Sequence, residues 1–257
     1  MQGKTLFVSG GTRGIGKAIV YAFAEKGCNV AFTYATNADT ANEIIADVEA
    51  KFGVKARAYQ LDILQPETYK DVYKLFDEDF DRLDFFISNA IISGRAVVGG
   101  FGPFMRLKPK GLNNIWTATV DAFVVGSQEA AKRMEKTGGG SIISMSSTGN
   151  LVYTPNYAGH GSNKAAVETM VRYAAAELGG MGIRVNAVSG GPIDTDALKA
   201  FPNYEEVKAE VAKRSPLNRM GESEDLTGAC LFLCNNKGAS WLTGQTIIVD
   251  GGTTFTS

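Results

Sequence analysis

The chain has 257 residues and a formal net charge of −1 at pH 7, with 44% hydrophobic and 21% charged residues. This length and composition suit one large α/β domain or two small ones. The near-neutral charge and the sequence pI of about 6.0 argue against nucleic acid as a partner, because that affinity depends on an excess of Lys and Arg.

Short strand-like runs alternate with longer helical patterns along the chain. Seven strands are predicted, at residues 5–9, 28–34, 55–60, 84–88, 141–145, 183–188 and 245–250. Helices are predicted at residues 16–26 and 38–51, from Pro66 onward, and at residues 113–136 and 155–178. The alternation predicts right-handed βαβ units, and therefore a doubly wound α/β fold with a seven-stranded parallel sheet and helices on both faces. No linker or repeat interrupts the pattern, so we expect residues 1–257 to form a single domain.

The sequence predicts a cytoplasmic protein. No apolar run approaches the roughly 18 residues that a membrane-spanning helix requires. The N-terminal residues pass from Lys4 directly into a strand, without the apolar region of a signal peptide. Cys28, Cys230 and Cys234 lack the spacing of zinc ligands, so we expect no metal site and a reducing compartment. Cys230 and Cys234 are expected to be buried, small apolar side chains.

The first strand is followed by the glycine-rich sequence SGGTRGIG. Gly10, Gly14 and Gly16 let the backbone turn tightly and approach a pyrophosphate, which a helix N-terminus attracts. We therefore predict a dinucleotide site here that includes Thr12 and Ile15. The spacing departs from GxGxxG, and a merely tight turn is the alternative interpretation.

The end of the second strand indicates which dinucleotide binds. An NAD site usually has an acidic residue there for the ribose 2′-hydroxyl. This chain has Tyr34-Ala35-Thr36-Asn37 instead, and Arg13 lies in the glycine-rich turn. Because a 2′-phosphate favours a cation, Thr36 and Arg13 predict NADPH. The alternative is that Arg13 is only an exposed loop residue.

Tyr157 and Lys164 lie seven residues apart, which is about two turns of a helix, so a helix would place them nearly on one face. A cation near a phenol lowers its pKa from about 10, which makes tyrosine a usable proton donor. The alternative is an exposed lysine and a half-buried tyrosine without chemistry.

Together these motifs resemble the short-chain dehydrogenase/reductase family over nearly the whole chain. The resemblance rests on residues 9–16, 61–63, 89–90, 144–147, 191–195 and 243–252. It implies a Rossmann-type fold and an oxidoreductase. It also implies cofactor contacts from Asp62, Ile63, Asn89, Ala90, Lys164, Pro192, Ile193 and Thr195.

The departures from the family pattern indicate the reaction. Ordinary members place the tyrosine four residues before the lysine, where this chain has its only histidine, His160. Tyr157 lies three residues earlier, and the spacing Tyr-x6-Lys resembles the enoyl-acyl-carrier-protein reductases. Thr119 replaces the asparagine of the ordinary proton relay. Residues 186–198 most resemble the type III enoyl reductases. The resemblance implies NADPH-dependent reduction of 2-enoyl-acyl-carrier-protein thioesters in fatty-acid synthesis.

The implied roles follow from this chemistry. Tyr157 would donate a hydrogen bond to the thioester oxygen, where negative charge develops in the transition state. Lys164 would hold the nicotinamide ribose and tune Tyr157. Ser147 is either a second contact to the oxygen or a turn serine. His160 is a competing proton donor, although we favour a bystander that lines the pocket or an interface.

Two other functions stay open. One is an NADPH-dependent ketone or alcohol oxidoreductase, of the 3-oxoacyl or hydroxysteroid type, with His160 or the displaced Tyr157 as donor. The other is a sensor that holds NADP(H) without turnover. Retention of both Tyr157 and Lys164 argues against the sensor.

Two segments are expected to contact the substrate, and the family implies a homotetramer. Residues 85–120 contain no acid but carry Arg95, Arg106, Lys108 and Lys110. This basic surface would attract an acidic acyl carrier protein, with a solvated loop as the alternative. The part at residues 93–112 is longer than usual in the family. Residues 197–214 are predicted to form a mobile lid.

Overall fold

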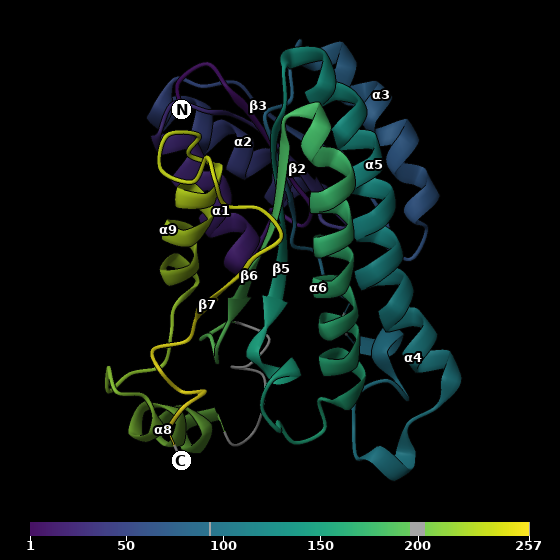
Figure 1. Cartoon of the computed structure of the whole chain (residues 1–257), viewed down its shortest axis with the longest axis vertical. Helices are drawn as coiled ribbons and strands as arrows, with labels where there is room; N and C mark the ends of the chain where they lie inside the picture. The colour runs from purple at the N-terminus through teal and green to yellow at the C-terminus, as the bar shows by residue number, and fades with distance from the viewer. Residues whose placement is uncertain (93, 196–203, 257) are drawn as a thin grey trace.

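The computed structural model describes residues 1–92, 94–195 and 204–256. Seven strands form one sheet in the order β3-β2-β1-β4-β5-β6-β7, and every neighbouring pair is parallel (Figure 1). The strands are β1 (Thr5–Val8), β2 (Asn29–Tyr34), β3 (Ala56–Gln60), β4 (Phe85–Ser88), β5 (Gly140–Ser147), β6 (Ile183–Gly190) and β7 (Thr246–Val249). The predicted doubly wound sheet is confirmed.

Helices cover both faces of the sheet. The helices are α1 (Gly14–Glu25), α2 (Ala38–Phe52), α3 (Tyr69–Asp79), α4 (Pro109–Trp116), α5 (Ala122–Met134), α6 (Ala158–Leu178), α8 (Tyr204–Arg214) and α9 (Ser223–Cys234). One hydrophobic core joins α1, α2 and α9 to the sheet, and a second joins α3, α5 and α6 to the opposite face.

The strands are apolar on both sides because both of their faces are buried. In β1, Phe7 belongs to the core beneath α3, α5 and α6, whereas Leu6 and Val8 belong to the opposite core. Phe7 stacks on Tyr73 of α3 with ring centroids 4.6 Å apart. Side chains of alternating direction along one strand therefore bind both helical layers to the sheet.

The prediction of one continuous helix at residues 113–136 is wrong in detail. The structure has α4, then a π-helical turn at Thr117–Asp121, then α5. The Trp116 indole donates a hydrogen bond to Asp121 at 3.0 Å across the turn. Thr119, the residue at the expected relay position, lies inside this turn. A π turn holds an extra residue, and hydrophobic periodicity cannot reveal such a local insertion.

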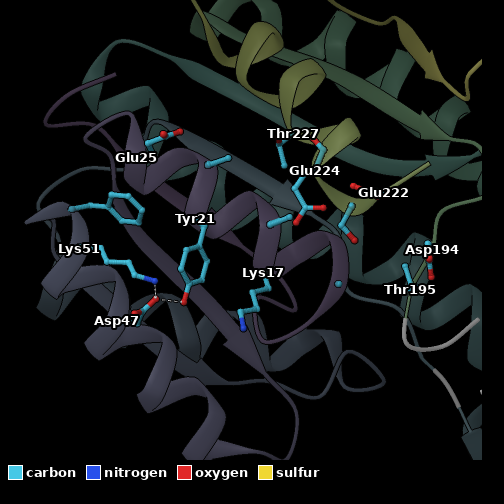
Figure 2. A pocket seen from close by; sticks show the side chains of 15 residues that line it. Lys17, Tyr21, Glu25, Asp47, Lys51, Asp194, Thr195, Glu222, Glu224 and Thr227 are labelled. Carbon is cyan, nitrogen blue, oxygen red and sulfur yellow. Dashed lines mark hydrogen bonds and ion pairs between the residues drawn. The ribbon is translucent and has the colours of Figure 1, made fainter. Parts of the chain in front are cut away.

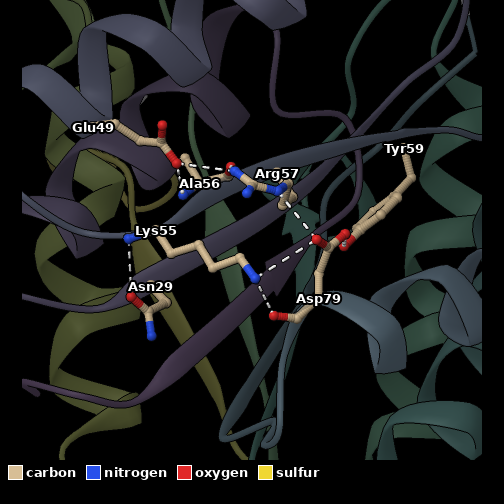
Figure 3. Close-up of polar contacts among 7 residues, drawn as sticks. All are labelled: Asn29, Glu49, Lys55, Ala56, Arg57, Tyr59 and Asp79. Atoms are coloured by element: carbon tan, nitrogen blue, oxygen red, sulfur yellow. Dashed lines mark hydrogen bonds and ion pairs between the residues drawn. The ribbon is translucent and has the colours of Figure 1, made fainter.

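A polar network fixes the edge strand β3 to both of its covering helices (Figure 3). The Arg57 guanidinium donates to Glu49 of α2 at 3.0 Å and to Asp79 of α3 at 3.1 Å. Asp79 also accepts a hydrogen bond from the Tyr59 hydroxyl at 2.8 Å and forms an ion pair with Lys55 at 3.6 Å. Charged side chains on an edge strand also discourage pairing with a second sheet.

The three cysteines are unpaired and buried, as predicted for Cys230 and Cys234. Burial raises the pKa of the Cys28 and Cys230 thiols to about 12, so both are inert at neutral pH. Within the described ranges, no helix is both long and apolar enough to cross a bilayer.

Candidate active site

The predicted site residues follow the C-terminal ends of the strands, which lie at one end of the sheet. In Figure 1 the arrowheads of β5 and β6 point toward this end, where α8 lies. After β1 comes the glycine turn, with Gly10, Thr12, Arg13, Gly14, Ile15 and Gly16. The later strands are followed by the other predicted cofactor residues: β2 by Thr36, β3 by Asp62 and Ile63, β4 by Asn89 and Ala90, and β6 by Pro192, Ile193 and Thr195. Ser147 ends β5, and Tyr157 precedes α6, which contains Lys164.

The glycine-rich turn is built so that backbone groups pack closely. Gly10 and Gly14 have φ angles of +73° and +50°, which side chains other than glycine rarely adopt. A Cβ atom at Gly16 would lie 1.9 Å from the Gly10 carbonyl oxygen. The turn leads directly into the N-terminus of α1 at Gly14. An exposed glycine backbone followed by a helix N-terminus fits a pyrophosphate.

Asn89 holds this turn against β4. Its side-chain amide donates hydrogen bonds to the carbonyl oxygens of Ser9 and Gly10, both at 3.0 Å. The backbone N–H groups of Asn89 and Ala90 donate to the Ser9 hydroxyl at 3.0 Å. The Asn89 amide, predicted as a cofactor contact, therefore positions the glycine turn.

The residues predicted to contact the adenosine half of the cofactor are exposed to solvent. Arg13 is the N-cap residue of α1 and its side chain is exposed, as is Thr36 beyond β2. Asp62 is also exposed, and one of its carboxylate oxygens accepts from the Leu64 N–H at 2.9 Å. Ile63 is buried below it.

The turn after β6 is tied to α8. The Asp194 carboxylate accepts hydrogen bonds from the Tyr204 hydroxyl at 2.7 Å and from Lys208 at 3.1 Å. The predicted lid lies only partly within the described chain, because residues 197–203 are outside it, whereas α8 is the remainder. Thr195 lies next to the glycine turn, since a Cβ at Gly14 would contact its methyl group at 4.0 Å.

Tyr157 is the N-cap residue of α6, so the helix begins three residues later than predicted. Its ring packs against Gly149, where an added Cβ would lie 2.5 Å from the ring. His160 stacks on the ring with centroids 5.3 Å apart, and Phe101 meets it edge-on at 6.5 Å. Burial raises the Tyr157 pKa, whereas a side-chain hydrogen bond with Ser147 lowers it.

The prediction that Lys164 lowers the pKa of Tyr157 is wrong. The Tyr157 pKa is raised rather than lowered, because burial outweighs the hydrogen bond with Ser147. The Lys164 ammonium is buried and donates to the Met145 carbonyl oxygen of β5 at 2.6 Å. Burial lowers the Lys164 pKa to about 8, and the Glu168 carboxylate acts against this shift.

His160 holds few protons at neutral pH. Burial, together with a smaller effect of the positive charge of Lys164, lowers its pKa to about 4. A protonated imidazole is therefore a minor species at pH 7, which weakens the competing assignment of His160 as the proton donor.

Comparison with known proteins identifies the family. A family model described as enoyl-(acyl carrier protein) reductase matches residues 10–254. A short-chain type dehydrogenase/reductase of Picea abies is 31% identical over 257 residues, covering 98% of this chain and 93% of that protein. This chain belongs to the short-chain dehydrogenase/reductase family. It is therefore an oxidoreductase of a family that uses NADH or NADPH.

Other similar members of the short-chain dehydrogenase/reductase family differ in their reactions. A 1-cyclohexenylcarbonyl-CoA reductase of Streptomyces collinus is 39% identical over 250 residues, covering 95% of this chain and 85% of that protein. A 3-oxoacyl-[acyl-carrier-protein] reductase of Staphylococcus epidermidis is 31% identical, covering 97% and 98%. Among solved structures, a short-chain dehydrogenase/reductase of Serratia marcescens aligns with a TM-score of 0.88 at 31% identity, covering 98% of each chain.

Tyr157 borders a cavity of about 450 Å³. Residues 102–104 form one wall, and Gly149 with residues 152–154 and 156 forms another. Phe104 and Tyr153 line it and are 79% and 90% exposed. Most of the residues that line it are apolar or aromatic, as is usual for sites that bind small molecules.

A larger groove of about 910 Å³ lies on the α1, α2 and α9 side (Figure 2). It begins near Gly14 and Thr195 and continues along α1. Tyr21 donates to Asp47 at 2.6 Å within it, and Lys51 binds the same carboxylate at 2.9 Å. Five carboxylates line it, from Glu25, Asp47, Asp194, Glu222 and Glu224, together with the two cations Lys17 and Lys51. None of Ser147, Tyr157 and Lys164 lines this groove, so it is a different pocket from the cavity that Tyr157 borders.

The structure adds residues that the sequence interpretation missed. Glu168 and Ser146 lie next to Lys164, and Phe101 contacts both Tyr157 and His160. The proximity of Glu168 to Lys164 was predictable, because Glu168 follows Lys164 by four residues in a predicted helix. The contacts of Phe101 were not predictable, since this residue comes from a loop that is distant in sequence.

Proposed function

We propose that this chain uses NADPH to reduce the carbon-carbon double bond of 2-enoyl-acyl-carrier-protein thioesters in fatty-acid biosynthesis. The observation that carries the proposal is the placement of Tyr157 and His160 at the start of α6. Tyr157 borders the cavity, while the ordinary tyrosine position holds His160, which is neutral and packed against Tyr157. The hydroxyl group thus lies three residues earlier in the sequence than in ordinary members of the family, and its tyrosine borders the cavity.

The choice of NADPH rests on charge. Arg13 begins α1 with an exposed guanidinium, and residues 34–37 after β2 include no carboxylate. The glycine turn and the α1 N-terminus would hold the pyrophosphate, Arg13 and Thr36 the 2′-phosphate, and Lys164 the nicotinamide ribose. When bound, NADPH supplies the hydride for the β-carbon of the enoyl group.

The residues of the chain stabilise the charge that results. Hydride addition at the β-carbon breaks the carbon-carbon double bond and moves its electron pair toward the thioester oxygen, so negative charge develops there as an enolate. Uptake of a proton at the α-carbon completes the reduction. The Tyr157 hydroxyl donates a hydrogen bond to that oxygen, and Ser147 fixes the direction of the hydroxyl or supplies a second contact. A hydrogen bond that strengthens in the transition state lowers the barrier, whereas one of equal strength in both states does not.

The thioester carrier is inferred from charge and from the relatives. Arg106, Lys108 and Lys110 are exposed beside the cavity wall that contains Phe104, so an acidic acyl carrier protein would be attracted there. The side chain of Arg95 lies outside the described part of the structure. The matching family model carries the name enoyl-(acyl carrier protein) reductase, and the Streptomyces collinus relative is named for a CoA thioester.

A second candidate is a 3-oxoacyl reductase, which the name of the Staphylococcus epidermidis relative supports.

NADPH oxidation should be measured with crotonyl and longer 2-enoyl thioesters, and in parallel with 3-oxoacyl thioesters, each linked to acyl carrier protein and to CoA. We expect higher kcat/KM with the enoyl series and with the acyl-carrier-protein forms. Faster turnover of the 3-oxoacyl series would assign the second function. A folded chain that binds NADPH but turns over neither series is a sensor.

A further inference from the structure

Glu168 is a buried carboxylate that the proposed chemistry does not use. Its residue is 9% exposed and lies in α6, one helical turn after Lys164. The Ser146 hydroxyl of β5 donates a hydrogen bond to it. Residues four apart share a helix face, so Glu168 and Lys164 both point toward the end of β5. A carboxylate is rarely buried unless another group satisfies its charge.

Lys164 needs such a partner. Lys164 is 8% exposed, and its ammonium donates a hydrogen bond to a neutral group, the Met145 carbonyl oxygen. Burial favours the neutral amine and lowers the Lys164 pKa to about 8, and the charge of Glu168 opposes this effect. Without the carboxylate, the buried amine would lose its proton at a lower pH.

The other elements packed against α6 offer no substitute within the described residues. Strand β5 carries no charged residue. The remaining charged groups on these elements bond elsewhere or are exposed: Asp121 with Trp116, Glu129 with Lys132 and Arg133, Arg184 with Leu242 and Asn236, and Lys110 on the surface. On α6 itself, Tyr157 and His160 are uncharged at pH 7, and Arg172 and Glu177 are exposed.

We propose that Glu168 is a positioning residue that keeps Lys164 charged, with Ser146 holding the carboxylate in place. This inference rests on the proposed function, in which Lys164 holds the cofactor. A charged lysine presents three N–H donors and a positive charge to the ribose, whereas the neutral amine has neither the charge nor the third donor. Glu168 acts through Lys164 and touches neither cofactor nor substrate.

The test is the pH dependence of NADPH binding. The dissociation constant is measured by NADPH fluorescence between pH 6 and 10 for the wild type and for Glu168→Gln, which keeps an acceptor for Ser146 but removes the charge. Binding weakens as Lys164 loses its proton, so it declines above the Lys164 pKa. We expect Glu168→Gln to move this decline downward by about one pH unit, with affinity at pH 6 within about twofold of the wild type.

Glu177→Gln is the matched control, because Glu177 is on the same helix, is exposed, and undergoes the same change of charge. Its profile should coincide with that of the wild type. A Glu168→Gln profile that coincides with the wild type, or that is weakened equally at every pH, overturns the proposal. The equal loss would mean a packing role alone.

A second variant, Glu168→Asp, decides the case if Glu168→Gln does not fold, because its shorter side chain draws the carboxylate back from Lys164. Lysine labelled with ¹³C at Cε is incorporated, and the Lys164 resonance is assigned from its absence in Lys164→Arg. A lower titration midpoint of Lys164 in Glu168→Asp than in the wild type supports the proposal. Equal midpoints contradict it. Neither readout involves a thioester, so the role of Glu168 is decided even if no enoyl substrate is turned over.

Discussion

The imidazole of His160 is stacked on the phenol of Tyr157, with ring centroids 5.3 Å apart and ring planes 25° apart. Phe101 packs edge-on against both rings. This arrangement holds Tyr157 at the start of α6, outside the regular helix. His160 therefore packs against Tyr157, and the two residues are expected to respond differently to substitution.

Tyr157→Phe should reduce kcat for enoyl thioesters by about 100-fold to 1000-fold, because it removes one hydrogen-bond donor to the developing oxyanion. NADPH affinity should stay within about twofold, since the ring and its stacking are kept. Steady-state kinetics and NADPH fluorescence titration measure the two effects. A variant that keeps more than about a tenth of the wild-type kcat contradicts the assigned role.

His160→Phe should retain kcat within about threefold, because phenylalanine preserves the stacked contact. The same assay and substrates are used as for Tyr157→Phe. If His160→Phe loses as much activity as Tyr157→Phe, the imidazole is the donor and the competing assignment is correct.

His160 should also make the chain sensitive to acid. Its pKa is about 4 in the folded state, against about 6.5 when unfolded, so between these values the unfolded chain binds more protons. The stability that the neutral His160 contributes is therefore present above pH 6.5 and is lost as the pH falls toward 4. Urea unfolding should show the wild type losing about 2 to 3 kcal/mol more than His160→Phe between pH 7 and pH 4. Equal losses in both proteins would mean that His160 is protonated in the folded state.

Arg13→Ala should weaken NADPH binding by about 10-fold to 100-fold, which corresponds to the loss of a charge-assisted hydrogen bond. NADH binding should change by less than about twofold, because NADH has no 2′-phosphate. Thr36→Asp should act in the same direction, since a carboxylate repels that phosphate. Calorimetric titration with both cofactors measures the ratio, and an unchanged ratio in both variants would remove the basis for NADPH preference.

Gly16→Ala should destabilise the chain by about 1 to 3 kcal/mol, because its Cβ would overlap the Gly10 carbonyl oxygen and force the turn apart. Gly228→Ala is the matched control, since Gly228 is exposed in α9 with no atom within 4 Å of an added Cβ. That substitution should stabilise the chain by about 0.5 to 1 kcal/mol. Urea unfolding of both variants checks the difference in sign.

Much of the fold was predictable because it depends on local patterns. Seven apolar runs separated by helical patterns predicted the strands, and each lies within a few residues of its expected position. The π turn at Thr117–Asp121 was not predictable, since its hydrogen bonds add a residue without changing the apolar pattern. The start of α6 was placed three residues early, because helix ends depend on contacts such as the stacking of Tyr157 on His160.

The sequence alone determined which chemical groups are present and in what order along the chain. It supplied the glycine turn, the spacing of Tyr157 and Lys164, and His160 between them. Only the tertiary structure decided their charge states. The pKa values of Tyr157, His160 and Lys164 all move in the direction set by burial, and burial depends on packing against Phe101, Gly149 and β5, which belong to other elements of the fold. The low dielectric of a packed interior belongs to the fold, and no run of neighbouring residues can specify it.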